Sequence, residues 1–240
     1  MQKEIILIQA AMEVECSNIL DKLDDVKEIG IQGYKYYEGL LQDKKIVISL
    51  SKVGLIHASA SLSLAISRFN PSIILNIGIA GATSEYLHTR DIVVGESVIN
   101  INSYRTPYKK KDEGSHSDEW ELVTFLSGEE DRLIEEKANS NLLKLTKEIF
   151  DSDNVYYGTI GSGDVWNKEI DRIVFLNQNY HILCEDMESI ATYTIANKCG
   201  IPVLSIKMIS DNILTNEEYD RDVGLYLQDY MMKFLLKIIR

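Results

Sequence analysis

Short apolar runs rich in isoleucine, valine and leucine alternate with stretches of helical periodicity along most of this chain of 240 residues. The apolar runs cover 5–10, 71–81, 91–99, 155–163, 181–187 and 201–210, and the helical stretches cover 14–23, 57–69, 139–150, 169–179, 188–200 and 222–239. Such alternation is typical of a mostly parallel sheet with helices on both faces. A hairpin predicted around Gln42–Asp43 adds antiparallel strands. The sequence therefore predicts an α/β protein with three layers, α/β/α, around a mixed, mostly parallel sheet.

The chain shows no linker, internal repeat or low-complexity tract, so residues 1–240 are predicted to form a single domain. The run 71–81 is expected to be a strand that ends in a glycine-rich turn. A polar stretch at 100–121 interrupts the alternation. It predicts an insertion-like loop around 100–130, and long loops in compact domains are usually functional or disordered.

Charge and cysteine content exclude several classes of partner. The net charge of −12 argues against nucleic acid, because phosphate binding needs a basic field, and it argues more weakly against an anionic membrane. The three cysteines show no CxxC or metal spacing, which is typical of a reducing cytoplasm. The N-terminus reaches acidic residues too early for a signal peptide, and no apolar run is long enough to span a bilayer.

Acidic side chains follow the ends of several predicted strands. Glu15, Asp164 and Asp211 come after three of these strands, and Asp186 and Glu188 follow the run YHILC. Ligands bind outside the carboxyl ends of the strands in such sheets, so these acids are predicted to surround one pocket. The four histidines are far apart and no zinc-binding spacing is present, so no metal and no cofactor is expected. Several carboxylates without a metal indicate acid–base chemistry or recognition of sugar hydroxyls.

Simpler interpretations exist for single members of this set. Glu15 could complement the dipole of the following helix, Asp211 could cap a helix, and Trp166 could belong to the core. Cys184 is expected to be a poor nucleophile, because neighbouring carboxylates raise the pKa of a thiol.

Six segments together resemble one family. The segments AAMEVE, NIGIAGA, DIVVGES, GTIGSGDVW, EDMES and IPVLSIKMISD occur in the order and spacing of the purine nucleoside phosphorylase and nucleosidase superfamily, and they are most similar to bacterial 5′-methylthioadenosine/S-adenosylhomocysteine nucleosidases. The resemblance covers nearly the whole chain except roughly 100–130. It implies a distorted central sheet flanked by helices, a cytoplasmic homodimer (with a hexamer as the alternative) and a small purine nucleoside as the partner.

The same resemblance implies the reaction and its catalytic residues. An adenosine derivative, such as methylthioadenosine or adenosylhomocysteine in methionine salvage, would be hydrolysed to adenine and the free sugar. Glu15 would activate water, and Asp211 would protonate N7 of the purine so that the base leaves more easily.

The binding residues follow by position in the same way. Glu188 would accept hydrogen bonds from the ribose hydroxyls, and Met187 would pack against the sugar. Trp166 would stack on the base, and the backbone of Asn167 would contact the purine edge. Glu185 receives no role and is interpreted as a solvated side chain.

Three further residues counted in the substrate site depart from the nucleosidase pattern. Ile79 replaces a serine, Asp186 replaces a glutamate, and Lys207 replaces an arginine, which is not equivalent at bidentate sites. Asn76 stands where the phosphorylases are expected to carry a phosphate-binding arginine, so water is favoured over phosphate as the nucleophile. The alternatives are a phosphorylase, a nucleoside-binding protein without catalysis, and, with little support, an interaction module.

Overall fold

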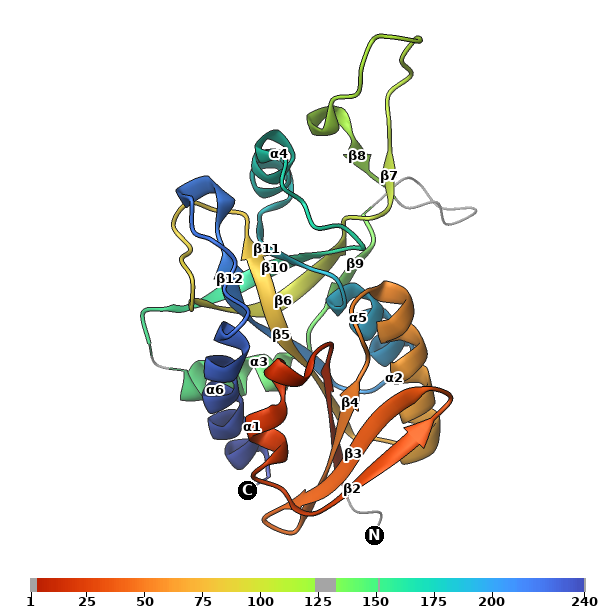
Figure 1. The fold of residues 1–240 in the computed structure, drawn as a ribbon, viewed down its shortest axis with the longest axis vertical. Helices are drawn as coiled ribbons and strands as arrows, with labels where there is room; N and C mark the ends of the chain where they lie inside the picture. The colour runs from red at the N-terminus through yellow and green to blue at the C-terminus, as the bar shows by residue number, and fades with distance from the viewer. Residues whose placement is uncertain (1–3, 124–132, 151, 240) are drawn as a thin grey trace.

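The structure is a computed structural model that describes residues 4–123, 133–150 and 152–239 (Figure 1). Its strands are β1 Ile5–Ala10, β2 Asp24–Ile31, β3 Tyr34–Leu41, β4 Lys44–Leu50, β5 Ile73–Ala82, β6 Ile92–Asn100, β7 Tyr104–Arg105, β8 Glu121–Leu122, β9 Glu135–Lys137, β10 Val155–Ser162, β11 Ile182–Asp186 and β12 Val203–Asp211. Its α-helices are α1 Ser17–Leu20, α2 Leu55–Phe69, α3 Ser140–Ile149, α4 Ile170–Tyr180, α5 Ser189–Lys198 and α6 Val223–Ile238. Short 3₁₀ turns lie at Glu13–Glu15, Ser117–Glu119 and Ile213–Thr215.

The central sheet is mixed and bends back on itself. Its strand order is β11-β10-β6-β12-β5-β1-β4-β3-β2, with β9 paired to β6. Parallel pairs join β11 to β10, β10 to β6, β12 to β5, β5 to β1 and β1 to β4, whereas β6–β12, β4–β3 and β3–β2 are antiparallel. The end of β11 also pairs with the end of β5. This additional pairing brings the carboxyl ends of β5, β11 and β12 together.

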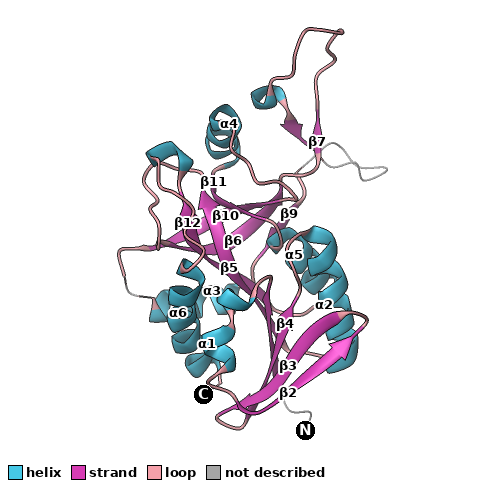
Figure 2. Ribbon diagram, viewed as in Figure 1, coloured by secondary structure: helices cyan, strands magenta, loops and turns pink. Residues whose placement is uncertain are grey.

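Helices cover both faces of the sheet (Figure 2). Ile19 of α1, Leu142 of α3 and Leu227 of α6 join one buried apolar cluster against the sheet. Leu62 of α2 and Tyr193 of α5 belong to a second cluster on the opposite face. The predicted α/β class with a mixed sheet between helical layers is confirmed. The sheet is not mostly parallel, because five of its strand pairs are parallel and five are antiparallel. Among the described residues, none of the helices combines the length and the apolar character needed to cross a membrane.

Two local predictions are corrected. The expected glycine-rich turn after 71–81 is absent, because β5 continues as a strand through Gly78 and Gly81 to Ala82. Glycine within a strand often marks a close approach by another group, and here a carbon added at Gly78 would lie 2.8 Å from Glu15 Oε1. The helix expected over 14–23 is reduced to a 3₁₀ turn and α1, because the edge strand β2 begins at Asp24.

The predicted insertion contains little regular structure. Strands β7 and β8 form a separate two-stranded sheet. Arg172 of α4 holds the segment between them, since its Nη1 donates to the carbonyls of Ser117 and Trp120 at 2.9 and 2.7 Å. Residues 124–132 of the predicted loop lie outside the described residues.

Candidate functional site

A cavity of about 260 Å³ lies at the carboxyl ends of β1, β5, β11 and β12. Its carboxyl groups come from Glu15, Glu185, Asp186, Glu188 and Asp211. None of the described residues that line it is a lysine, arginine or histidine. The remaining residues singled out from the sequence also line it, namely Ile79, Trp166, Asn167 and Met187, whereas Lys207 lies behind the wall and contacts Asp186.

Glu15 is held rigidly at the bottom of the cavity. Its Oε2 accepts from the backbone N–H groups of Ala11 and Met12 at 2.8 and 2.9 Å, and its Oε1 accepts from Ile79 N at 3.2 Å. Burial raises the pKa of Glu15, while Lys207 and these N–H groups oppose the rise. A carboxylate offers about four acceptor positions, so one lone pair of Oε1 is left for a ligand. Glu15 is thus a buried and oriented carboxyl group rather than a surface acid at a helix start.

Lys207 and Asp186 form a buried ion pair. Lys207 Nζ lies 2.8 Å from Asp186 Oδ2, and the side chains are 1% and 0% exposed. Asp186 also accepts from Ser189 N at 3.2 Å and from Ser189 Oγ at 2.5 Å. Burial alone would raise the pKa of Asp186, but Lys207, Ser162 and Ser189 outweigh burial and hold the pKa below its usual value. Asp186 is therefore the permanently ionised partner of the lysine.

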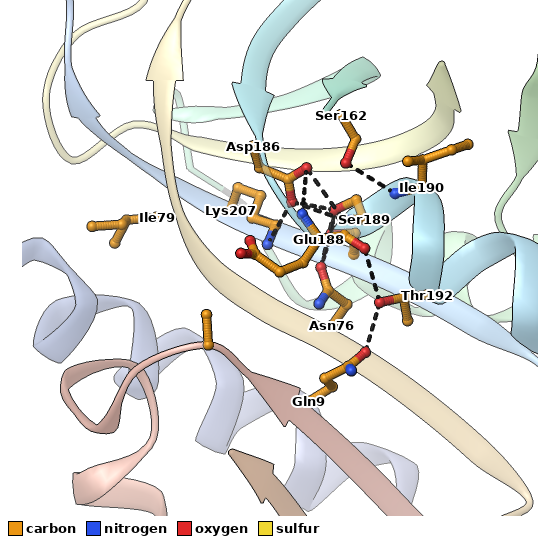
Figure 3. A network of polar contacts seen from close by, with 12 residues as sticks. Gln9, Asn76, Ile79, Ser162, Asp186, Glu188, Ser189, Ile190, Thr192 and Lys207 are labelled. Atoms are coloured by element: carbon orange, nitrogen blue, oxygen red, sulfur yellow. Dashed lines mark hydrogen bonds and ion pairs between the residues drawn. The ribbon is translucent and has the colours of Figure 1, made fainter. Parts of the chain in front are cut away.

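A hydrogen-bonded layer supports this pair from behind (Figure 3). Ser205 Oγ donates to Asn76 Oδ1 at 3.0 Å, and Ser189 Oγ lies 2.9 Å from the same oxygen. Asn76 is buried and does not line the cavity. Asn76 therefore supports the residues that form the cavity wall and does not contact a ligand.

Glu188 connects the cavity to the start of α2. Its Oε1 accepts from Gly54 N at 2.9 Å, and Asp164 Oδ1 accepts from Leu55 N at 2.7 Å. The first N–H groups of a helix have no partner within the helix. Glu188 and Asp164 supply acceptors for two of these N–H groups at the start of α2. Burial, followed by the charge of Asp186, raises the pKa of Glu188 to about 8. Asp164 was predicted to surround the same pocket, but it does not line the cavity and instead accepts from the start of α2.

Asp211 lies at the opposite side of the cavity. It is the last residue of β12, and Ser210 Oγ donates to its Oδ1 at 2.6 Å. The neighbouring Asn212, not Asp211, caps the following turn by accepting from Leu214 N. The interpretation of Asp211 as a helix cap is therefore wrong.

Trp166 and Tyr219 form the rim beside Asp211. Trp166 is 59% exposed, and its ring centroid lies 5.2 Å from that of Tyr219. This exposure excludes the alternative in which Trp166 belongs to the core. Cys184, by contrast, is buried behind the wall, and burial together with Asp186 raises its pKa well above the usual thiol value, as expected for a poor nucleophile.

The interpretation of Glu185 as a solvated bystander is wrong. Its side chain lines the cavity, and Asn167 Nδ2 lies 3.5 Å from its Oε1. Burial raises the pKa of Glu185 to about 7, against the opposing effects of Asn167 and Arg172. Strand alternation was the available signal, because residues i and i+2 of a strand share a face. The sequence does not show that the end of β11 pairs with β5 as well as with β10, and this double pairing places Glu185 at the cavity. Among the described residues, no group of three His, Cys, Asp or Glu side chains is placed to hold a metal ion.

Known proteins resemble this chain in both sequence and fold. The family model described as Phosphorylase superfamily matches residues 5–235. A 5′-methylthioadenosine/S-adenosylhomocysteine nucleosidase of Staphylococcus haemolyticus is 29% identical over 207 residues, which is 85% of each chain. The structure of the nucleosidase of the same name from S. pneumoniae superposes with a TM-score of 0.79 at 20% identity, covering 96% of this chain and 98% of that one. Futalosine hydrolase of Helicobacter pylori gives a TM-score of 0.80 at 20% identity, with 98% of both chains covered.

Proposed function

Since the chain belongs to the Phosphorylase superfamily, we propose that it is an N-glycosyl hydrolase, a nucleosidase that breaks the bond between the base and the sugar of a purine nucleoside. The observation that carries the proposal is the pairing of Glu15 and Asp211 across one cavity whose described lining has carboxyl groups but no cationic side chain. Water would supply the new bond to the sugar carbon, and the base would leave with the electrons of the broken C–N bond.

Glu15 is assigned as the general base. Burial raises the pKa of Glu15, which makes its carboxylate a stronger acceptor for a proton from water. The N–H groups of Ala11, Met12 and Ile79 fix its orientation. A fixed acceptor lowers the entropic cost of placing the attacking water.

Asp211 is assigned as the acid for the leaving group. Protonation of the purine at N7 neutralises the electron pair that the base takes with it, so the C–N bond breaks more readily. Ser210 Oγ donates to Oδ1 of Asp211, so Oδ2 is left to contact the base. This oxygen lies above Gly81, since a Cβ atom added to Gly81 would be 3.5 Å from it.

Glu188 is assigned to the sugar. Gly54 N occupies its Oε1, so Oε2 is left for the ribose hydroxyls, with Met187 beside it in the wall. Positive charge develops on the sugar as the C–N bond breaks. This charge favours the ionised form of Glu188, which would stabilise it in turn. Trp166 would stack on the base from the rim, and the Asn167 backbone would contact its edge.

Hydrolysis is favoured over phosphorolysis because of charge. A phosphate dianion needs cationic or N–H donors, whereas the described lining of this cavity is acidic. Lys207 is committed to Asp186, and Asn76 lies behind the wall. A phosphate ion at the position of the water would therefore be repelled by the negative charge of Glu15.

The test is a panel of nucleosides with and without phosphate. Methylthioadenosine, adenosylhomocysteine, adenosine, inosine and futalosine are incubated with the protein, and free base is measured. The expected result is release of base without phosphate, first of all from methylthioadenosine or adenosylhomocysteine, which would fit a role in methionine salvage. Strict dependence on phosphate would select the phosphorylase instead, and tight binding without release would select a non-catalytic binding protein.

We also propose a cytoplasmic homodimer. Val53, Val165, Trp166 and Tyr219 line the cavity mouth and are each at least 40% exposed. Apolar side chains grouped at a rim are a mark of an interaction surface. Sedimentation equilibrium should give twice the mass of the 27.3 kDa chain, and the mass of a single chain or of a hexamer would refute this assembly.

A further inference from the structure

Glu185 is the carboxyl group of the cavity that the proposed reaction leaves without a task. It is not at the sugar end, where Glu15, Glu188 and the Lys207–Asp186 pair lie. Instead it lies across Gly81 from Asp211, because Gly81 of β5 pairs with Glu185 on one side and with Asp211 on the other. The three residues form one row across three adjacent strands.

Residues paired in this way direct their side chains to the same face of a sheet. Glu185 and Asp211 are thus separated by two strand spacings, roughly 10 Å, and Gly81 leaves the space between them free of side-chain atoms. A ligand between the two carboxyl groups would make a hydrogen bond of roughly 2.8 Å to each of them. The remaining part of the distance between Glu185 and Asp211 fits a flat bicyclic ring. A purine whose N7 faces Asp211 then turns the edge of its six-membered ring toward Glu185.

Asn167 completes the contact surface for that edge. Its Oδ1 accepts from Glu169 N at 3.2 Å, which fixes the amide so that Nδ2 lies 3.5 Å from Glu185 Oε1. An acceptor from Glu185 and a donor from Asn167 therefore stand side by side. A 6-oxopurine such as hypoxanthine presents the complementary pair, with an N–H at position 1 and an oxygen at position 6. Adenine presents the reverse pair, an acceptor at N1 and an amino group at position 6.

We propose that Glu185, with Asn167 beside it, recognises the six-membered ring of the base and extends the substrates of this nucleosidase to 6-oxopurine nucleosides. The inference rests on the proposed function, since it uses Asp211 at N7 to orient the base. Ionised Glu185 accepts the N1–H of a 6-oxopurine. Protonated Glu185 donates to N1 of adenine instead, so the same side chain serves both bases in its two protonation states.

The charges around Glu185 allow both states near neutral pH. Burial raises its pKa to about 7, Arg172 of α4 opposes the rise, and Asp211 of β12 adds to it. Raising the pH ionises Glu185, so the preference for the 6-oxo base over the 6-amino base should increase with pH through this range.

The experiment compares two substrates that differ only in the base, the 5′-methylthio derivatives of inosine and adenosine. The ratio of their kcat/KM values is measured from pH 5.5 to 8.5 for the wild type, for Glu185→Gln and for the matched exposed control Glu148→Gln on α3. We expect the ratio to rise about tenfold or more with pH in the wild type and the control. In Glu185→Gln, whose amide can donate or accept but carries no titrating proton, the ratio should be independent of pH. A wild-type ratio that does not change with pH, or the same rise in Glu185→Gln, would overturn the inference.

Binding of the free bases separates this inference from the proposed reaction. Calorimetry with hypoxanthine and adenine measures base recognition whether or not the bond is cleaved. Hypoxanthine binding that weakens about tenfold in Glu185→Gln supports the role of Glu185, even if neither nucleoside is hydrolysed and the proposed reaction is wrong. Hypoxanthine binding that is unchanged in this variant refutes that role, even if hydrolysis is observed.

Discussion

The two ends of the cavity differ in how many protein partners their buried charged groups have. At the sugar end, Lys207 is surrounded by Asp186, Glu188 and Glu15, and burial of the lysine, which would lower its pKa, is outweighed by these three acids. At the base end, Asp211 and Glu185 have few protein partners, namely Ser210 for one and Asn167 for the other. The Lys207–Asp186 pair at the first end is completed by the protein, and Glu15 and Glu188 keep only part of their acceptor capacity for a ligand. The two carboxyl groups of the second end have fewer protein partners.

Substitutions at the first end are therefore expected to change the stability of the fold, and substitutions at the second end are expected to change binding or turnover. Removing one member of a buried, fully paired set leaves an uncompensated charge and destabilises the fold. Removing a carboxyl group that faces open space should instead leave the fold intact and change only binding or turnover. The two ends are thus expected to respond differently to substitution.

The largest effect is expected from Lys207→Met. The change leaves Asp186 buried without its partner, so the free energy of unfolding should fall by about 3–5 kcal/mol. Denaturant titration followed by circular dichroism measures this fall. The matched control is Lys45→Met, whose ion pair with Glu38 is 2.7 Å long but partly exposed and should be worth less than about 1 kcal/mol. Equal losses in the two variants would contradict the distinction between the ends.

The second effect is expected at the base end from Asp211→Asn. An amide cannot protonate N7, so turnover should fall by about 10²–10⁴-fold while the midpoint of thermal unfolding stays within a few degrees of the wild type. Release of base and thermal unfolding are measured on the same preparation. The control is Asp229→Asn on the exposed side of α6, which should leave both unchanged. Near-normal turnover in Asp211→Asn would remove this residue from the mechanism.

The sequence predicted the fold class well because apolar runs and helical periodicity report burial directly. It also indicated Glu15, Glu188 and Asp211, since each lies at the end of a strand or in the turn that follows one. The turn predicted at Gly78–Gly81 was wrong because glycine marks both turns and close approaches. Only the three-dimensional arrangement shows that Glu15 Oε1 occupies the space beside Gly78.

Glu185 could not be placed from the sequence for a related reason. Its neighbour Asp186 points toward Lys207, and the sequence gives no sign that Glu185, which pairs with Gly161 of β10, also pairs with Gly81 of β5. The pairing depends on the way the sheet closes, which is a property of all its strands together. Roles that depend on such long-range pairing require a structure.

A third, smaller effect is expected from Trp166→Ala at the rim. Stacking of an aromatic ring on a base contributes about 1–3 kcal/mol, so the dissociation constant for adenine should rise about tenfold. Stability should not change, because Trp166 is 59% exposed. Calorimetry measures the binding, with Tyr108→Ala as the control at an aromatic side chain that is 87% exposed in the 100–121 segment. If both variants bind adenine as the wild type does, the base does not stack on Trp166.

The smallest effect is the dependence of stability on pH. Burial raises the pKa of Glu188 to about 8, above its value in an unfolded chain of about 4.3. A raised pKa contributes stability that is complete below the unfolded value and is lost as the pH rises through the folded value. The midpoint of thermal unfolding should therefore fall by a few degrees between pH 5.5 and 8.5. Asp186, whose pKa is lowered, loses its contribution only at more acidic pH.

The variant Glu188→Gln isolates this contribution. Its Oε1 can still accept from Gly54 N, which Glu188 holds at 2.9 Å, but it has no proton to lose. The pKa of His88 is also raised, by its hydrogen bond to Glu217, and this contribution falls with pH in the same direction in both proteins. The fall in the unfolding midpoint between pH 5.5 and 8.5 should therefore be smaller in Glu188→Gln than in the wild type. Equal falls would mean that Glu188 is already ionised at neutral pH, and the sugar end would then carry a net negative charge before the ligand arrives.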